Sequence, residues 1–283
     1  MSRAADLVRL EEKSRQMRIA TVKTVYWAGG GHLGGALSVT DILTVLYFYT
    51  MRIQFRDPCF EERDRLILSK GHAGIGLAPF LADIGYIDKE ILKTFNHTNS
   101  TLGMHLDMRK VPGVEASTGS LGHGLSLGAG LALAARIRRK DYRTFVILGD
   151  GECNEGSVWE AAMAISHYRL SNLITIIDRN HLMYDGDTEA VLALEPLKEK
   201  WASFGFRVFE TDGHDIAGLC SVFDAALAEA NEPCAVICRT IKGCGVAELE
   251  NRRESHYVSI SDEAMLQRYI DSVNEYHNRR SRK

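Results

Sequence analysis

Two polar motifs stand where apolar runs of strand length end in this chain of 283 residues. Gly149-Asp150-Gly151 closes one run, and Asn180 closes the next about thirty residues later. Parallel strands present their carboxyl ends at one edge of a sheet, so Asp150 and Asn180 are expected to converge there. Their oxygens, with a backbone carbonyl just past Asn180, suit Mg²⁺ and leave positions for phosphate oxygens and a water. Either residue alone favours a helix cap or a turn, but the pair at this spacing indicates a metal–diphosphate site.

Four histidines lie in segments of small or polar residues and not on apolar stripes. A single histidine of this kind is usually just solvated. Four of them indicate a polar cavity lined by proton donors and acceptors whose ordinary pKa is near neutrality. They are His32, His72, His105 and His256.

The elements that would position these groups alternate between helices and strands. Apolar runs without alternation are typical of parallel strands whose two faces are both covered. A helix between two such runs makes a right-handed strand–helix–strand unit. The expected strands are 64–69, 144–150, 173–178, 207–212 and 235–240, and the expected helices are about 4–28, 41–50, 156–169 and 216–230.

Two shorter segments refine this pattern. Residues 38–41 resemble a capping box that would open the helix 41–50. The small residues of 119–135, at helical spacing, permit close approach to another helix or to a ligand. We therefore expect one α/β domain over residues 1–283, with a doubly wound parallel sheet, helices on both faces and a short C-terminal tail from about 260.

Composition narrows the class of protein. Hydrophobic residues make up 45% and charged residues 25%, as in ordinary globular domains, and a formal net charge of -3 gives no reason to expect nucleic acid. No apolar stretch has the length of a signal peptide core or the ~18 residues of a membrane span. Six scattered cysteines form no zinc-type cluster, and we expect them to be reduced in a cytoplasmic protein. A basic cluster is expected to be a frayed, solvated tail: Arg279, Arg280, Arg282 and Lys283.

From about residue 15 to residue 256, the chain resembles the N-terminal portion of transketolase. The GDG…N pair is shared by many thiamine-diphosphate enzymes. The glycine-flanked His32, the SKGH motif at His72 and the TGSLGHG stretch narrow the resemblance to transketolase-like proteins. The segments that carry it are GGGHLGGALSVTDILTVLYF, DRLILSKGHAGIGLAPFLADIGY, GMHLD, STGSLGHGLSLGAGLALAAR, GDGECNEGSVWEAAMAISHYRLSNLITIIDRN, FGFRVFETDGHD and TIKGCGV.

The resemblance implies thiamine diphosphate as cofactor, with Mg²⁺ or Ca²⁺. It implies metal ligands at Asp150, Asn180 and the carbonyl of Leu182. It implies cofactor contacts at His72, Gly119, Ser120, Leu121, Gly151, Asn180 and His256. Among the four expected catalytic histidines, His72 and His256 resemble groups at the diphosphate, with His256 also facing substrate. His32 and His105 resemble channel residues that bind sugar hydroxyls and assist proton transfer. Glu155 resembles a carboxylate at the subunit interface.

The chain has no counterpart of the pyrimidine-binding domain, and a complete transketolase is more than twice as long. The resemblance therefore implies the N-terminal subunit of a split transketolase. With a partner carrying that domain, as an α2β2 heterotetramer, it would transfer a two-carbon ketol unit from a ketose, expected to be phosphorylated, to an aldose. Four positions depart from the family pattern and bear on the substrate: Leu33, His123, His181 and Tyr184.

Three other interpretations remain open at this point. A related two-chain thiamine enzyme would pass the two-carbon unit elsewhere, for example to an acyl carrier. A dinucleotide-binding protein is suggested by 29–34, which matches G-x-G-x-x-G, but helix and not strand is expected before it. A non-catalytic scaffold would use the fold only for assembly.

Overall fold

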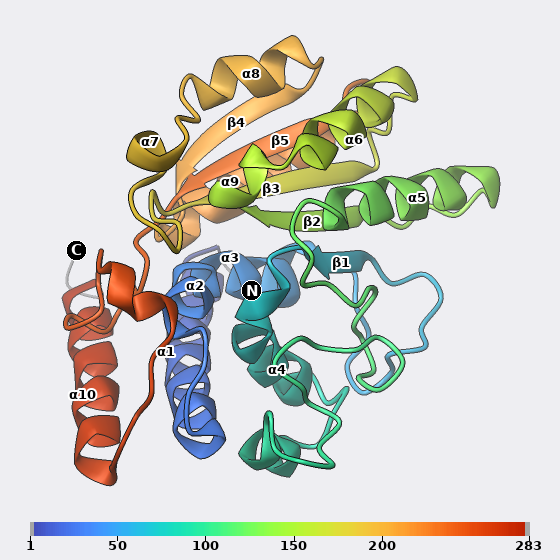
Figure 1. Cartoon of the computed structure of the whole chain (residues 1–283). Coiled ribbons are helices and arrows are strands. Elements are labelled where there is room, and N and C mark those ends of the chain that lie inside the picture. Colours follow the sequence, from blue (N-terminus) through green and yellow to red (C-terminus); the bar gives the residue numbers. More distant parts are fainter. Residues whose placement is uncertain (1–2, 281–283) are drawn as a thin grey trace.

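A five-stranded parallel sheet organises the computed structural model, which describes residues 3–280. The strands lie in the order β1-β2-β3-β5-β4, so the expected fold class is confirmed (Figure 1). Each expected strand is present to within about a residue at its ends. The strands are β1 (Arg65–Leu68), β2 (Thr144–Gly149), β3 (Leu173–Arg179), β4 (Arg207–Asp212) and β5 (Cys234–Arg239).

Ten α-helices connect and cover the strands in the described part of the chain. The four helices expected from the sequence are present, although the one at 41–50 is α3 extended by a π-helical turn, Leu46–Thr50. None of these helices is long and apolar enough to cross a membrane. They are α1 (Arg3–Ala28), α2 (Leu33–Ser38), α3 (Thr40–Val45), α4 (Gly74–Asp83), α5 (Gly124–Ile137), α6 (Gly156–His167), α7 (Thr188–Val191), α8 (Leu197–Ser203), α9 (Ile216–Ala228) and α10 (Glu263–Arg280).

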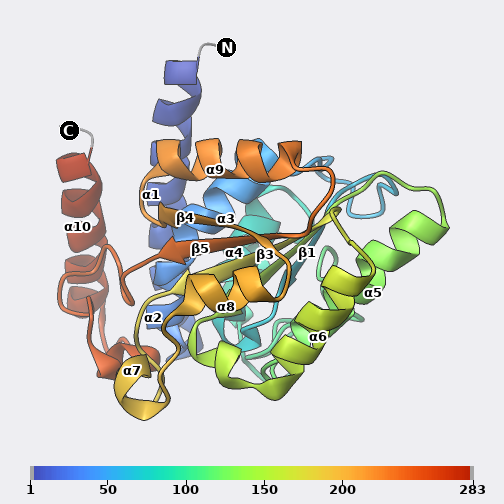
Figure 2. The same ribbon diagram turned by 90° about the horizontal axis from the view of Figure 1, so that it is seen from above.

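The two faces of the sheet belong to two hydrophobic cores. Successive side chains of a strand point to opposite faces. Phe145 and Ile147 of β2 therefore join the core under α1, α3, α4 and α9, whereas Val146 and Leu148 join the core under α5, α6 and α8 (Figure 2). This arrangement explains why the central strands β2 and β3 are almost unbroken apolar runs: nearly every residue along them is buried on one face of the sheet or the other.

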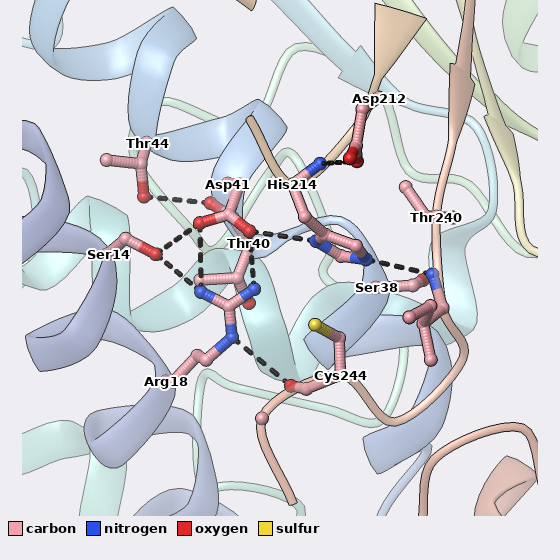
Figure 3. A network of polar contacts seen from close by, with 12 residues as sticks. Ser14, Arg18, Ser38, Thr40, Asp41, Thr44, Asp212, His214, Thr240 and Cys244 are labelled. Atoms are coloured by element: carbon pink, nitrogen blue, oxygen red, sulfur yellow. Dashed lines mark hydrogen bonds and ion pairs between the residues drawn. The ribbon is translucent and has the colours of Figure 1, made fainter. Parts of the chain in front are cut away.

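A buried ion pair joins the helices at the two ends of the described chain. Arg18 of α1 and Asp41 of α3 are both fully buried, 2.6 Å apart at their closest atoms (Figure 3). Arg280 of α10 reaches the same carboxylate at 3.2 Å and also pairs with Glu11 of α1. Although burial favours the protonated acid, Arg18 and Arg280 hold the pKa of Asp41 well below its ordinary value.

This network corrects the tail prediction. The segment after 260 contains α10, which packs along α1 (Figure 1). A frayed, solvated tail is wrong for Arg280, because the buried carboxylate of Asp41 needs its charge. Arg279 is exposed, and Arg282 and Lys283 lie outside the described residues.

The capping-box prediction for 38–41 is also wrong. Ser38 is the last residue of α2, and α3 begins at Thr40 with no side-chain cap. The Ser38 hydroxyl instead donates to the Asp178 carboxylate at 2.6 Å, and Asp41 is held by Arg18. Ser38 and Asp41, whose types and spacing fit a helix cap, instead connect α2 to the end of β3 and α3 to α1.

Candidate active site

The carboxyl ends of four strands and the start of α2 surround one cavity of about 390 Å³. The site predicted from Asp150 and Asn180 lies at this edge of the sheet, as expected for parallel strands. Thirteen of the twenty lining residues are polar or charged, and about half of the twenty were predicted above. The lining residues are His32, Gly35, Lys70, His72, His105, Gly119, Leu121, Gly149, Asp150, Gly151, Glu152, Asn154, Glu155, Asn180, Leu182, Met183, Tyr184, Asp185, Lys242 and His256.

Asp150 follows β2 directly and is nearly fully buried. Its carboxylate accepts the amides of Gly151 at 2.8 Å and His181 at 2.6 Å, and it lies 3.2 Å from Arg179. Burial, followed by the nearby Asp178 carboxylate, raises the pKa of Asp150. A bound cation would relieve this cost, because it would favour the ionised carboxylate.

Asn180 and Leu182 form a tight turn after β3. The side-chain oxygen of Asn180 accepts the Leu182 amide at 3.1 Å. The Leu182 carbonyl accepts a hydrogen bond of 3.0 Å from the ammonium of Lys242, which follows β5. His181 lies in this turn, and its amide donates a hydrogen bond to Asp150. This bond connects the end of β3 to the end of β2.

The histidines predicted to line a polar cavity do so. His32, His72 and His256 form a triangle whose ring centroids are 5.2 to 5.4 Å apart. His105 lies on the same cavity. The Nδ1 atom of His32 is buried without a hydrogen-bond partner among the described residues.

A short antiparallel bridge holds His32 beside His256 across a long separation in sequence. The Gly31 amide donates to the Val258 carbonyl at 3.0 Å, and the Val258 amide donates to the Gly31 carbonyl at 2.9 Å. Gly34, two residues after His32, packs directly on this segment, because a Cβ there would stand 2.6 Å from the Ser255 carbonyl oxygen. A larger residue at Gly34 would push the two histidines apart.

The small-residue loop before α5 forms another wall of the cavity. Gly119 has a φ of +156°, and a Cβ there would come within 2.7 Å of the His105 ring, so only glycine brings the two so close. Leu121 lines the cavity, whereas Ser120 is exposed and does not. The α-helix starts only at Gly124, so the first residues of the stretch 119–135 are a loop.

Glu152 is a buried carboxylate to which sequence reasoning assigned no role. It accepts the amides of Gly122 at 2.8 Å and Gly149 at 3.1 Å, and a hydrogen bond from the Ser69 hydroxyl. One side chain thus joins the ends of β1 and β2 to the loop before α5. Its only signal in the sequence is its place in GDGECNEG, two residues after Asp150.

Two lysines on the cavity also went unassigned. Lys70, in the SKGH motif, forms a buried ion pair with Asp178. Lys242, in TIKGCGV, is 3% exposed, and burial together with Lys70 lowers its pKa to about 8. A lysine in a strand-end turn is usually solvated, so the residue types alone do not reveal either one.

The four departures from the family pattern lie in different places. Leu33 is the first residue of α2, a position that also accepts proline, so the helix is kept. His123 and His181 are exposed and do not line the cavity. Tyr184 stands at the cavity with its ring edge-on to His256, 5.2 Å between centroids. Of the four, Tyr184 is therefore placed to affect what binds there.

The geometry makes the central histidines neutral. Burial, reinforced by Lys70, lowers the pKa of His72 to about 2, and burial, reinforced by Lys242, lowers the pKa of His256 to about 4. Burial also lowers the pKa of His32. At neutral pH these rings each offer one N–H donor and one acceptor nitrogen, which is suited to moving a proton to and from a bound molecule.

We expect stability to fall in acid because of these histidines. An unfolded histidine titrates near 6.5, above the pKa of His72 in the folded state, so below that pH the unfolded chain binds more protons. The free energy of unfolding should then decrease by up to about 1.4 kcal/mol per pH unit for each such histidine, and be fully retained above about pH 6.5. Thermal melts of the wild type and His72→Gln between about pH 5 and pH 8 measure this, since glutamine does not titrate. The variant should depend less on pH, and parallel curves would contradict the assignment.

The donor set suits a diphosphate with a hard cation. The predicted ligands are all oxygens, Gly151 lies on the cavity beside Asp150, and Lys242 supplies positive charge. No group of three or more His, Cys, Asp or Glu residues in the described chain is arranged for a metal, but the predicted set contains a single carboxylate. The cavity residues therefore fit the group that the sequence predicts.

Comparisons with known proteins agree with this geometry. The family model described as "Transketolase, thiamine diphosphate binding domain" matches residues 11–271. The chain is 42% identical over 248 residues to one of the subunits of the apulose-4-phosphate transketolase of Phocaeicola vulgatus, and the match covers 88% of each chain. It is 39% identical over 254 residues to 6-deoxy-6-sulfo-D-fructose transketolase subunit SqwG of Clostridium sp., covering 90% of this chain and 92% of that protein.

Solved structures give the same picture at the level of the fold. The crystal structure of transketolase from Campylobacter jejuni superposes with a TM-score of 0.83 at 29% identity. The match covers 96% of this chain and 47% of that one. A transketolase of Pichia stipitis in complex with sedoheptulose-7-phosphate gives a TM-score of 0.85, with 44% of its chain covered. The chain thus spans about half the length of the solved transketolases that it matches.

Proposed function

This chain belongs to the transketolase thiamine-diphosphate-binding family, and from that membership we propose that it is the N-terminal subunit of a two-chain transketolase. It holds the diphosphate of thiamine diphosphate together with Mg²⁺ or Ca²⁺. With a partner that carries the pyrimidine-binding domain, it transfers a two-carbon ketol unit from a phosphorylated ketose to an aldose.

The single observation that carries this proposal is the convergence of four histidines and the Asp150–Asn180 pair on one cavity. These groups come from distant parts of the chain and lie at the carboxyl ends of the strands. A scaffold used only for assembly has no need of such a cavity. The dinucleotide alternative is weakened further because the glycines at 29–34 follow helix α1 and not a strand.

We assign the metal to Asp150, the side-chain oxygen of Asn180 and the carbonyl of Leu182. The first two are joined through the turn after β3, and all three lie on the cavity. Gly151 and His72 would contact the diphosphate, and Gly119 and Leu121 would lie along the cofactor. The exposed Ser120 would do so only through its backbone.

When bound, thiamine diphosphate would supply a nucleophilic carbon and an electron sink, the chemistry that two-carbon transfer between sugars requires. The chain's own residues bind the sugar and handle protons. His32 and His256, neutral and in edge contact, would donate to and accept from substrate hydroxyls. His105 would extend this wall outward, and Tyr184 would border it beside His256.

The lengths of the related proteins and the exposed apolar side chains of this chain both support a two-chain enzyme. The chain covers about nine-tenths of the relatives named as single subunits of apulose-4-phosphate transketolases, but less than half of the solved transketolases. Glu155 is exposed at the rim of the cavity, beside the loop before α5. Large apolar side chains are exposed on α5 and α6, as a stable interface would use: Leu127, Ile137 and Met163.

The test is co-expression with a transketolase-like partner encoded nearby, followed by a screen of ketose donors against aldehyde acceptors. The relatives are named for apulose-4-phosphate and 6-deoxy-6-sulfo-D-fructose, so phosphorylated and sulfonated ketoses belong in the screen. An acyl-carrier acceptor is included as the alternative. Transfer to the carrier and to no aldose would replace the transketolase assignment with that alternative.

In the two-chain enzyme, alanine at His32 or His256 should lower turnover on the order of 10²-fold, the range of lost acid–base help. Little stability should be lost: the His32 Nδ1 atom has no partner to lose among the described residues, and His256 would give up the contact of its Nδ1 with the Lys242 ammonium at 3.1 Å. Initial rates and melting temperatures are compared with those of His123→Ala, an exposed histidine outside the cavity. A large fall in melting temperature with normal turnover would make the two histidines structural.

A further inference from the structure

The short connection between β4 and α9 lies directly against the end of β5. A Cβ at Gly213 would stand 2.4 Å from the Thr240 side chain, so glycine permits this close approach. The Gly213 amide donates to the Arg239 carbonyl at 2.7 Å. The amide of His214 donates to the Asp212 carboxylate at 2.8 Å (Figure 3). These contacts place the His214 side chain between the end of β5 and α3.

The His214 ring forms one hydrogen bond on each side. Its Nε2 atom accepts the Ile241 amide at 2.8 Å, which requires that this nitrogen carry no proton. Its Nδ1 atom therefore carries the ring proton and donates it to Asp41 at 2.9 Å (Figure 3). The side chain is 10% exposed, so little water competes for either bond. The ring thus connects segment 240–244, which follows β5, to a buried carboxylate.

The His214 ring is neutral in this arrangement. Although burial acts in the opposite direction, the hydrogen bond to Asp41 raises the pKa of His214. Two other features act against a second ring proton. The Ile241 amide can donate only to an unprotonated Nε2, and Arg18 and Arg280 already balance the charge of Asp41. We therefore assign the ring one donor nitrogen and one acceptor nitrogen.

Two further contacts hold the far end of this segment. The Gly243 amide donates to the Gly34 carbonyl of α2 at 3.0 Å. The Cys244 carbonyl accepts a hydrogen bond of 3.2 Å from Arg18, which is itself paired with Asp41 (Figure 3). The Asp41 carboxylate therefore holds the segment at both ends, through the imidazole at one end and the guanidinium at the other.

The same segment contributes to the wall of the cavity. Its Lys242 side chain lines the cavity and connects two other parts of the wall, because the ammonium donates to the Leu182 carbonyl at 3.0 Å and lies 3.1 Å from Nδ1 of His256. A displaced segment would change these contacts together. His214 does not line the cavity, so it acts on the wall only through the segment.

We propose that His214 is a positioning residue for the proposed cofactor site. From outside the cavity, it fixes segment 240–244, so that this wall is formed before thiamine diphosphate binds. The inference rests on the proposed function. Arg18 and Arg280 would still pair with Asp41 if the imidazole were removed, so the fold should survive its loss.

Hydrogen exchange and calorimetry with the full chain, alone and with its partner, test the inference. In the wild type without cofactor, the Ile241 amide should exchange slowly. His214→Leu can neither donate nor accept a hydrogen bond, so this exchange should become faster. The same variant should bind thiamine diphosphate with Mg²⁺ about 10-fold more weakly, the loss expected for one buried hydrogen bond. His214→Gln keeps a donor and an acceptor and should recover part of both losses.

Two controls separate positioning from folding. Melting temperatures measure how far each variant is destabilised, and His97→Leu, at an exposed position outside the cavity, should bind the cofactor as the wild type does. A folded His214→Leu that is less stable but binds the cofactor as tightly as the wild type makes His214 a structural residue and overturns its role alone. Rapid exchange of the Ile241 amide in the wild type overturns that role without any variant. If neither the wild-type chain nor its complex binds thiamine diphosphate, the proposed function falls as well.

Discussion

Asp150→Ala should reduce the affinity of the two-chain enzyme for thiamine diphosphate and Mg²⁺ by at least about 100-fold. The variant removes the one carboxylate of the proposed metal set. It leaves the diphosphate charge uncompensated and the metal short of a hard ligand. Losing one partner of a buried charge pair costs about 3–5 kcal/mol, and every 1.4 kcal/mol is tenfold in affinity.

The fold should survive this change. Arg179, which pairs with Asp150, also pairs with Glu189 at 2.9 Å and Glu195 at 3.0 Å. Melting temperatures therefore check that lost binding is not lost structure. Asp271→Ala, an exposed carboxylate on α10, is the matched control. If calorimetry shows Asp150→Ala binding cofactor and metal as well as the wild type, the assignment is wrong.

The purified chain alone should have no transketolase activity. Its motifs account for the diphosphate end of the cofactor, and none supplies the surroundings of the pyrimidine ring. Adding a partner of roughly 300 residues should restore two-carbon transfer, with two copies of each chain in the complex. The measurements are initial rates with and without the partner, and the mass of the assembly.

A surface variant separates assembly from folding. Leu127, 47% exposed on α5, lies on the face proposed for the partner. Leu127→Asp should leave the chain folded but prevent the complex from forming, since burying an unpaired carboxylate is unfavourable. Activity from the isolated chain, in a preparation shown by mass spectrometry to contain no partner, would refute the two-chain interpretation.

Strands and strand-end residues were predictable because their signals are local. Phe145 to Leu148 of β2 are each buried in one core or the other, so this apolar run is by itself evidence for a buried strand. Asp150 and Asn180 follow from the geometry of parallel strands. The sequence context of the four histidines predicted that they line one cavity. It did not predict that His32 contacts His256, because this contact depends on the bridge between Gly31 and Val258.

Burial of charge was not predictable, because it depends on partners distant in sequence. The sequence predicts a solvated Arg280. In the structure it is an ion-pair partner of the buried Asp41, which lies far upstream in the sequence. Glu152 and Lys242 stand in turns where charged residues are usually exposed, and only the packing of several loops encloses them. The prediction that Ser38 caps a helix was wrong for the same reason: its hydroxyl donates a hydrogen bond to the buried carboxylate of Asp178.

The Gly31–Val258 bridge has a consequence for biosynthesis. His32 leaves the ribosome early, and its neighbour His256 follows only after all five strands have been made. Contacts between such distant segments form only after a large loop is closed, so they form late. The sheet can assemble on a nascent chain while the histidine wall is still incomplete. If His256 contacts cofactor and substrate as proposed, cofactor loading waits until the segment around His256 has emerged, and a partner that docks earlier finds the proposed sugar-binding side incomplete.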